Sequence, residues 1–103
     1  DSDMVEDQEN VVKMMTVHTA KGLEFPVVFI VGMEENIFPH FMALNPDGRD
    51  IEEERRLCYV SMTRAKQKLY LVNAEERYSF GRCIKNAPSR FLREIPNHLI
   101  KKV

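Results

Sequence analysis

The stretch I-E-E-E-R-R-L-C-Y-V-S-M-T-R-A, residues 51–65, is the most strongly specified helix in the sequence. Asp50 can cap its first turn, and Glu53 can act as the capping-box partner. The run of glutamates suits the positive end of the helix dipole. An apolar stripe at helical spacing follows, made of Leu57, Cys58, Met62 and Ala65. The sequence therefore predicts a helix that buries this stripe.

Arg64 lies at the flank of the stripe, in the last turn of the predicted helix. A cation at the C-terminal end of a helix is stabilised by the helix dipole, and Lys66 adds another just beyond. From the helix alone, Arg64 is a helix-end charge that needs no function to explain it. A more specific role for Arg64 depends on the rest of the chain.

The composition is that of an ordinary globular protein of one domain, with 103 residues, 44% hydrophobic and 30% charged. No apolar run approaches the roughly twenty residues of a membrane span, and no secretory signal opens the sequence. Cys58 and Cys83 form no C-x-x-C pair, which predicts reduced thiols and a cytoplasmic location. The three histidines lack metal-ligand spacing, so we expect no metal site.

The charges are graded along the chain, although the formal net charge is only −1. That net charge argues against nucleic-acid binding by bulk electrostatics alone. Residues 1–10 are acidic and predict a linker or tail, whereas residues 77–102 are mostly basic and suit phosphate contacts. We expect residues 97–103 to form a second tail.

Short apolar segments predict the remaining regular structure. Three of them predict strands, at residues 11–17, 26–31 and 67–73. A last short helix begins near Ser89 and is stopped by Pro96. Two segments without a sustained period predict a surface excursion and an irregular stretch, at residues 33–50 and 77–87. Alternating strands and helices predict an α/β fold, with a mostly parallel sheet and flanking helices.

The link between the first two predicted strands has about eight residues, fewer than the ten to twelve or more that a parallel crossover normally takes. Either these strands are not neighbours, or a strand between them is missing. We therefore expect an incomplete sheet, with no ladder between residues 12–17 and 27–31. The larger apolar side chains are predicted to be core rather than base-stacking platforms: Phe25, Phe29, Phe80, Phe91, Met14, Met15 and Met33.

The loop H-T-A-K-G-L-E-F, residues 18–25, follows the first predicted strand, and strand ends form the ligand edge of open α/β sheets. Side chains that can donate to a phosphate oxygen are Thr16, His18 and Thr19, and Lys21 adds a point charge. The loop is therefore a candidate ligand site, with an ordinary polar connection as the alternative.

Two further residues refine this loop. Gly22 lets the backbone come close to a ligand. Glu24 would repel phosphate, so it belongs beside a ribose hydroxyl or pairs with Lys21 to hold the loop in shape. The residues alone leave both roles of Glu24 open.

The motifs of the chain resemble those of one family. They are T-V-H-T-A-K-G-L-E-F-P-V-V-F-I-V-G-M-E-E, then F-P-H, then E-E-E-R-R-L-C-Y-V-S-M-T-R-A-K with K-L-Y-L, and finally P-S-R-F-L. Together they closely resemble the C-terminal motor segment of UvrD/PcrA/Rep-type superfamily 1 DNA helicases, from about Val12 to Pro96. The two long motifs, V and VI of that family, are highly specific as a pair.

The resemblance implies half of a catalytic site, in a partial RecA-like (P-loop NTPase-type) domain over residues 11–96. In such helicases ATP and Mg²⁺ lie between two RecA-like domains. The first domain supplies the Walker A lysine and the Mg²⁺-binding carboxylates, and the second supplies an arginine, which the motif match places at Arg64. A permanently charged, planar guanidinium suits the spreading charge of phosphoryl transfer.

The resemblance also assigns the loop. Glu24 matches the glutamate that approaches the ribose, beside Gly22. Thr16 and His18 match positions that contact the backbone of single-stranded DNA, and Lys21 belongs to the same loop. One loop would then contact nucleotide on one side and DNA on the other.

Departures from the family pattern are small, at Ser61-Met62 and Thr19, and none removes a charged group. The sequence has no G-x-x-x-x-G-K-[S/T] motif, so it lacks a phosphate cradle of its own. We therefore predict an inactive fragment of a longer 3′–5′ helicase. Its partners would be single-stranded DNA, the missing first motor domain and, through an open sheet edge, a second copy. The alternative is a stand-alone interaction or nucleic-acid-binding module without ATPase activity.

Overall fold

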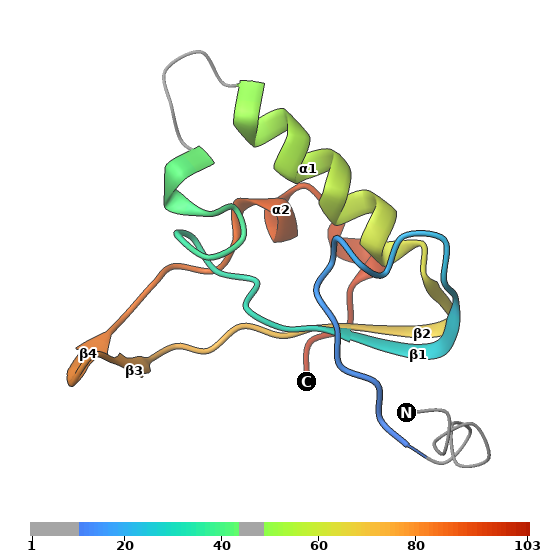
Figure 1. Ribbon diagram of the computed structural model, residues 1–103, viewed down its shortest axis with the longest axis horizontal. Coiled ribbons are helices and arrows are strands. Elements are labelled where there is room, and N and C mark those ends of the chain that lie inside the picture. The colour runs from blue at the N-terminus through green and yellow to red at the C-terminus, as the bar shows by residue number, and fades with distance from the viewer. Residues whose placement is uncertain (1–10, 44–48) are drawn as a thin grey trace.

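The computed structural model describes residues 11–43 and 49–103. Two strands lie side by side, β1 (Phe25–Ile30) and β2 (Ala65–Leu71), and the helix α1 (Arg49–Met62) crosses above them (Figure 1). The strands pair in parallel, with Phe29 opposite Tyr70 and a register shift between Phe25 and Val27. The fold is therefore α/β with a parallel strand pair, as the sequence predicts.

The helix α1 starts and ends earlier than predicted. It begins at Arg49, so Asp50 lies inside its first turn rather than at the cap. The carboxylate of Glu53 pairs with Arg56 at 2.7 Å instead of closing a capping box. The helix ends at Met62, which places Arg64 in the turn after it and Ala65 in β2. The five consecutive charged residues 52–56 favour the i,i+3 pairs seen here over a capping box.

Residues 11–17 form no strand, so that prediction is wrong. In the described part of the chain β1 pairs only with β2, and no ladder joins it to residues 12–17. Val12 and Met14 are exposed, because a strand forms only beside a neighbour and none of the described strands is available to them. Val17 alone packs against the core.

The core is small and lies between α1, the strands and the C-terminal helix. Its buried members are Ile30, Met33, Phe38, Cys58 and Phe91. The rings of Phe38 and Phe91 meet edge to face, with centroids 5.5 Å apart. Met33 and Phe38 come from the segment 33–50 that was predicted to be a surface excursion, so that prediction is wrong for its first part.

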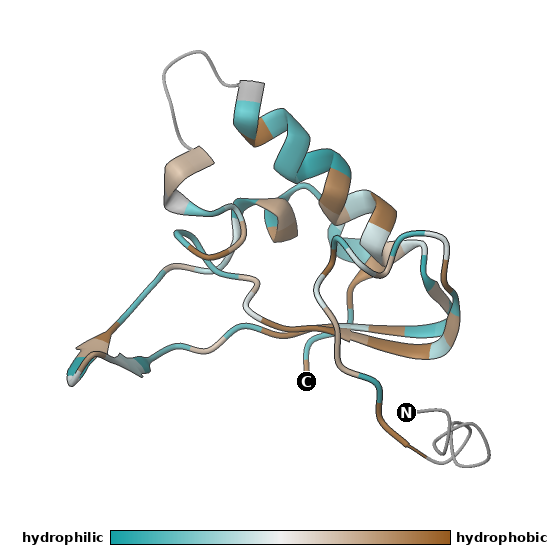
Figure 2. Cartoon of the chain, viewed as in Figure 1, coloured by the Kyte–Doolittle hydropathy of each residue, from teal (hydrophilic) through white to brown (hydrophobic). Residues whose placement is uncertain are grey.

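Several apolar side chains predicted to be core are exposed: Phe29, Phe80, Met14 and Met15. The Phe29 ring stacks on Tyr70 at 4.5 Å, on the sheet face opposite the core. Figure 2 shows hydrophobic colouring along much of β1, a hydrophilic first half of β2, and the polar N-terminal half of α1. A parallel sheet normally has both faces covered, and this pair has one.

Residues 77–87 are not irregular but contain an antiparallel hairpin, β3 (Arg77–Ser79) with β4 (Arg82–Ile84). Its turn residues Phe80 and Gly81 have φ of 53° and 75°, and positive values at both positions are typical of a type I′ turn. Figure 1 shows the hairpin projecting away from α1 and from the β1–β2 pair.

The chain ends in short helical elements. The predicted last helix is confirmed as α2 (Arg90–Arg93), whose N-cap Ser89 accepts a hydrogen bond from the Phe91 N–H at 3.2 Å. Two 3-10 turns are η3 (Phe41–Ala43) and η4 (Asn97–Leu99). Among the described residues, no helix is long and apolar enough to cross a membrane. The predicted acidic segment 1–10 lies outside the described residues.

Candidate functional site

The loop before β1 is closed by two threonines. The backbone N–H of Thr19 donates to the side-chain oxygen of Thr16 at 3.2 Å. The Thr19 hydroxyl donates to the Thr16 carbonyl at 2.9 Å. The Ala20 N–H also donates to the Thr16 carbonyl, at 3.2 Å. Thr16 therefore acts as the capping residue of a tight turn that exposes His18 and Lys21.

Gly22 and Glu24 complete the loop. Gly22 has a φ of 83°, and a Cβ there would meet no atom within 4 Å, so the glycine is required by the backbone conformation. Glu24 is exposed. No ion pair joins Lys21 to Glu24 within the described part of the chain, so the structure does not support the pair that the sequence left open.

Arg64 lies beside this loop. Its carbonyl accepts a hydrogen bond from the Phe25 N–H at 2.8 Å, immediately after Glu24. Its side chain turns back on α1: Nε donates to the Val60 carbonyl at 3.2 Å, and a terminal nitrogen donates to the Thr63 hydroxyl at 3.0 Å. The guanidinium thus caps the C-terminal end of α1, while part of its N–H donors remain for another acceptor.

The parallel pairing fixes this juxtaposition. Phe25 is opposite Ala65, so Glu24 and Arg64 immediately precede the paired first residues of two neighbouring strands. The loop was predicted to follow a strand at the carboxyl edge of the sheet, and that is wrong, because residues 11–17 form no strand. Gly22, Glu24 and Arg64 instead lie at the amino ends of β1 and β2.

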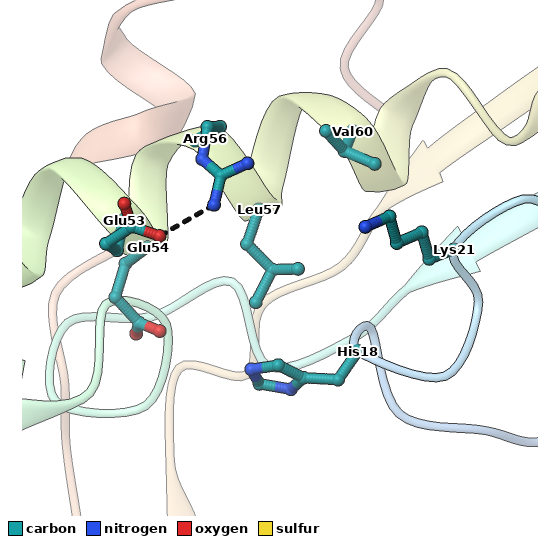
Figure 3. A pocket seen from close by; sticks show the side chains of 7 residues that line it. All are labelled: His18, Lys21, Glu53, Glu54, Arg56, Leu57 and Val60. Carbon is teal, nitrogen blue, oxygen red and sulfur yellow. Dashed lines mark hydrogen bonds and ion pairs between the residues drawn. The ribbon is translucent and has the colours of Figure 1, made fainter.

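A hollow of about 250 Å³ separates the loop from α1 (Figure 3). The loop contributes His18 and Lys21, and α1 contributes the rest of the lining: Glu53, Glu54, Arg56, Leu57 and Val60. Figure 3 shows His18 across from Glu54 and Leu57, and the ion pair of Arg56 with Glu53 at the rim. Two of the predicted DNA-contacting residues, His18 and Lys21, therefore share a charged hollow, whereas Thr16 and the predicted nucleotide-contacting residues are not among its lining residues.

Cys58 faces the core from the same helix. Burial, followed by the negative charge of Glu94, raises the pKa of its thiol to about 11. The thiol is therefore protonated and inert at neutral pH. Within residues 11–43 and 49–103, no group of three or more His, Cys, Asp or Glu side chains could hold a metal ion.

Sequence reasoning missed the exposed ring at the tip of the β3–β4 hairpin. Phe80 is fully exposed, and Tyr78 nearly so, beside the exposed Arg82 and Lys85. The signal was present in the Phe80-Gly81 pair, because a glycine between short alternating runs is typical of a hairpin turn. Exposed rings beside cations can stack on nucleic-acid bases.

The profile of the UvrD-like helicase C-terminal domain matches residues 1–76. The chain belongs to this family. Relatives of this UvrD-like chain include the ATP-dependent DNA helicase PcrA of Staphylococcus epidermidis (strain RP62A), 57% identical over 95 residues. The PcrA of Staphylococcus aureus (strain MRSA252) is 55% identical over 96 residues. The alignments cover 91% and 92% of this chain but only 13% of each relative.

Proposed function

We propose that this UvrD-like chain is the C-terminal part of the second RecA-like motor domain of a longer ATP-dependent DNA helicase that moves 3′ to 5′ along single-stranded DNA. The observation that carries the proposal is the hydrogen bond from the Phe25 N–H to the Arg64 carbonyl. It joins the family's two signature motifs, the Glu24 loop and the end of α1, at one point of the fold.

In this proposal Arg64 is the arginine finger. Phosphoryl transfer spreads negative charge over the transferred group, and a guanidinium with free donors stabilises that charge. Gly22 and Glu24 would lie toward the ribose of ATP. Mg²⁺ and the Walker lysine would belong to the first motor domain, because this chain has no Walker A motif. The hydrogen bonds from Arg64 to Val60 and Thr63 hold the side chain until ATP is present.

The DNA contacts are assigned to the other side of the same loop. Thr16, His18 and Lys21 lie on one tight turn, and His18 and Lys21 open onto the hollow beside α1. The acidic Glu53 and Glu54 line the far wall of that hollow, so the phosphates would lie along the loop rather than inside the hollow. Closing the cleft on ATP would then move the DNA-contacting turn.

We divide the chain into an acidic linker (1–10), a partial motor domain (11–96) and a tail (97–103). The exposed outer sheet face supports the view that the domain is partial. Its apolar residues are Val27 and Phe29 of β1, Tyr70 of β2, and Val31 and Val72 just after these strands. Such a face is normally buried in a parallel sheet. The remainder of the motor domain would cover it.

The experiment uses a longer polypeptide that contains the first motor domain and the remainder of the second motor domain together with this chain. Arg64→Ala should lower DNA-stimulated ATP turnover by about 10³- to 10⁵-fold and leave nucleotide binding largely intact. Arg93→Ala, an exposed helix-end arginine of α2, is the matched control and should leave turnover unchanged. A fall of less than tenfold for Arg64→Ala would return the side chain to the role of a helix-end charge.

A second candidate function is a stand-alone nucleic-acid-binding module without ATPase activity. The exposed rings of Tyr78 and Phe80 beside Arg82 favour it. In that case the 103-residue chain should bind a single-stranded oligonucleotide tightly, and adding the first motor domain and the remainder of the second should restore no ATP hydrolysis.

Self-association is the remaining proposal. Among the described residues β1 and β2 pair only with each other, so the outer edge of each is open. Open edges are templates for pairing with a second copy. Sedimentation of the chain over a concentration series would detect a dimer, and a constant monomer mass would exclude one.

A further inference from the structure

One short segment after β1 holds both ends of the projecting hairpin. We call residues 33–36 the clamp, and residues 74–88, which include β3 and β4, the arm. At the outgoing end of the arm, the Glu34 carboxylate accepts hydrogen bonds from the Ala74 N–H at 2.7 Å and from Arg77 Nε and a terminal nitrogen, both at 2.8 Å. At the point where the arm leaves the rest of the fold, one carboxylate therefore accepts three hydrogen bonds from it.

The returning end is bound by the same segment. The Glu35 N–H donates to the Ala87 carbonyl at 2.9 Å, and the Asn36 side chain donates to Asn86 at 3.1 Å. Just beyond the arm, the Arg90 N–H and guanidinium both donate to the Glu35 carboxylate. Two adjacent glutamates thus each hold one end of the arm through an arginine.

Glu34 is fully buried, and a buried carboxylate is costly unless it is paired and hydrogen-bonded. Hydrogen bonding from Arg77 holds the pKa of Glu34 below its usual value, so the carboxylate is charged. An apolar contact of the same size would stabilise the fold as well as a buried ion pair does. What the two-pronged arginine contact adds is a fixed direction, because the planar guanidinium and carboxylate bind in one orientation.

The far end of the arm has the opposite character. The Phe80 ring is fully exposed. The backbone φ of Phe80 is 53°, a value that residues other than glycine seldom adopt. Figure 1 shows the β3–β4 hairpin reaching away from α1 and the β1–β2 pair. The direction of the arm therefore decides where this ring lies, and the base of the arm decides its direction.

We propose that Glu34 is a positioning residue that acts through Phe80. By gripping Ala74 and Arg77, its carboxylate holds the arm at a fixed angle to β1 and so places the exposed ring where a DNA base can stack on it. This inference rests on the DNA-binding function proposed above and extends it to a residue that contacts no DNA.

The first experiment measures the direction of the arm without DNA. Nitroxide labels are placed on Cys83, the exposed thiol of β4, and on Val27→Cys, on the exposed face of β1. The buried Cys58 stays unlabelled. We expect a narrow label-to-label distance distribution in the parent chain and a broad one after Glu34→Gln.

Two further variants make the measurement decisive. Arg77→Lys keeps the charge but loses the two-pronged contact, so it should broaden the distribution in a chain that still folds. Glu76→Gln is the matched control, because Glu76 is exposed and pairs with Lys85 within the arm. It should leave the distribution narrow. Unchanged narrow distributions in both Glu34→Gln and Arg77→Lys would overturn the positioning role.

The second experiment is a double-mutant cycle on the affinity for a short oligodeoxythymidine, measured by fluorescence anisotropy. Phe80→Ala should weaken binding by roughly five- to a hundredfold, the range for loss of one stacked base. Glu34→Gln should weaken it too, but should cause no further loss when Phe80 is already alanine. A full additional loss in the double variant would show that Glu34 does not act through Phe80.

The two experiments separate this inference from the function on which it rests. If the parent chain binds no oligonucleotide, the DNA contact proposed for the arm is overturned. The label distances still decide, independently, whether Glu34 sets the direction of the arm.

Discussion

The loop of residues 16–24 and the clamp of residues 33–36 lie at opposite ends of β1 and treat charge in opposite ways. In the loop, Lys21 and Glu24 are exposed, and neither takes part in an ion pair within the described residues. In the clamp, Glu34 and Glu35 are largely buried, and each is paired with an arginine. The chain satisfies the charges of the clamp itself, whereas in the proposed function those of the loop are available to a ligand.

Arg64 stands between these two cases. Its side chain is half-buried, and among the described residues it hydrogen-bonds only to Val60 and Thr63, at the C-terminal end of α1. The difference teaches that burial and pairing separate residues that hold the fold from residues whose charges remain available, and the proposed function assigns the latter to ligands. The following predictions compare the stability of variants in the two regions, in order of decreasing effect.

The largest effect on stability is expected in the buried core. Phe91→Ala removes a buried ring that meets Phe38 edge to face and should cost about 3–5 kcal/mol. Leu23→Ala, at an exposed position of the loop, should change stability by less than about 0.5 kcal/mol. Urea unfolding curves of both variants measure the difference, and similar midpoints would contradict it.

A matched pair of substitutions compares the two glutamates directly. Glu34→Gln should lower the free energy of unfolding by on the order of 2 kcal/mol, because it weakens hydrogen bonds to a charged group. Glu24→Gln should leave stability unchanged and instead weaken nucleotide affinity or coupling in the longer polypeptide. Thermal unfolding and nucleotide titration of both variants measure the two effects. Lower stability in Glu24→Gln together with unchanged stability in Glu34→Gln would refute the comparison.

Acid should destabilise the fold through its arginine-paired glutamates. A hydrogen bond from an arginine side chain holds the pKa of each of three glutamates below the ordinary 4.5. The pairs are Arg77 with Glu34, Arg90 with Glu35, and Arg55 with Glu94. A lowered folded-state pKa contributes stability that is complete above pH 4.5 and is lost as pH falls through the folded-state value.

Stability should therefore be insensitive to these groups at neutral pH and fall steadily below about pH 4.5. Unfolding midpoints at a series of pH values measure it. In Glu34→Gln the acid-dependent loss should be smaller than in the parent chain. An equal loss would remove Glu34 from the pH dependence.

The smallest expected effects come from the two glycines that flank β1. Gly22→Ala should cost about 1 kcal/mol for the positive φ alone, because the new Cβ meets open space. Gly32→Ala should cost more, since its Cβ would lie 3.2 Å from Ile37 Cγ2. Equal unfolding free energies for the two variants would show that the clamp side of β1 is no more tightly packed than the loop side.

Local patterns predicted the elements that depend on local physics. The sequence indicated the apolar run of β1, the strand formers of β2, the charge pattern of α1 and the helix start near Ser89, and the structure confirms these elements. The same patterns wrongly predicted a strand at residues 11–17, because an apolar run becomes a strand only if a neighbouring strand is present to pair with it.

The errors in the core have a similar cause. Phe29 has the composition of a buried strand residue, yet no described element covers its face of the sheet. Phe80 was assigned to the core by residue type, but a type I′ turn places it at the tip of the arm. Residue type indicates a preference for burial, and only the neighbours in space determine whether that preference is met.

The sequence by itself determined the family, the α/β class and the identities of Arg64, Glu24, Gly22, His18, Lys21 and Thr16 as candidate site residues, because motif spacing and hydrophobic period are local properties of a chain. Only the tertiary structure decided that Arg64 lies beside the glutamate loop and that Glu34 meets Arg77 across 43 positions of sequence. Such contacts arise from strand register and burial, which join residues that no local pattern connects.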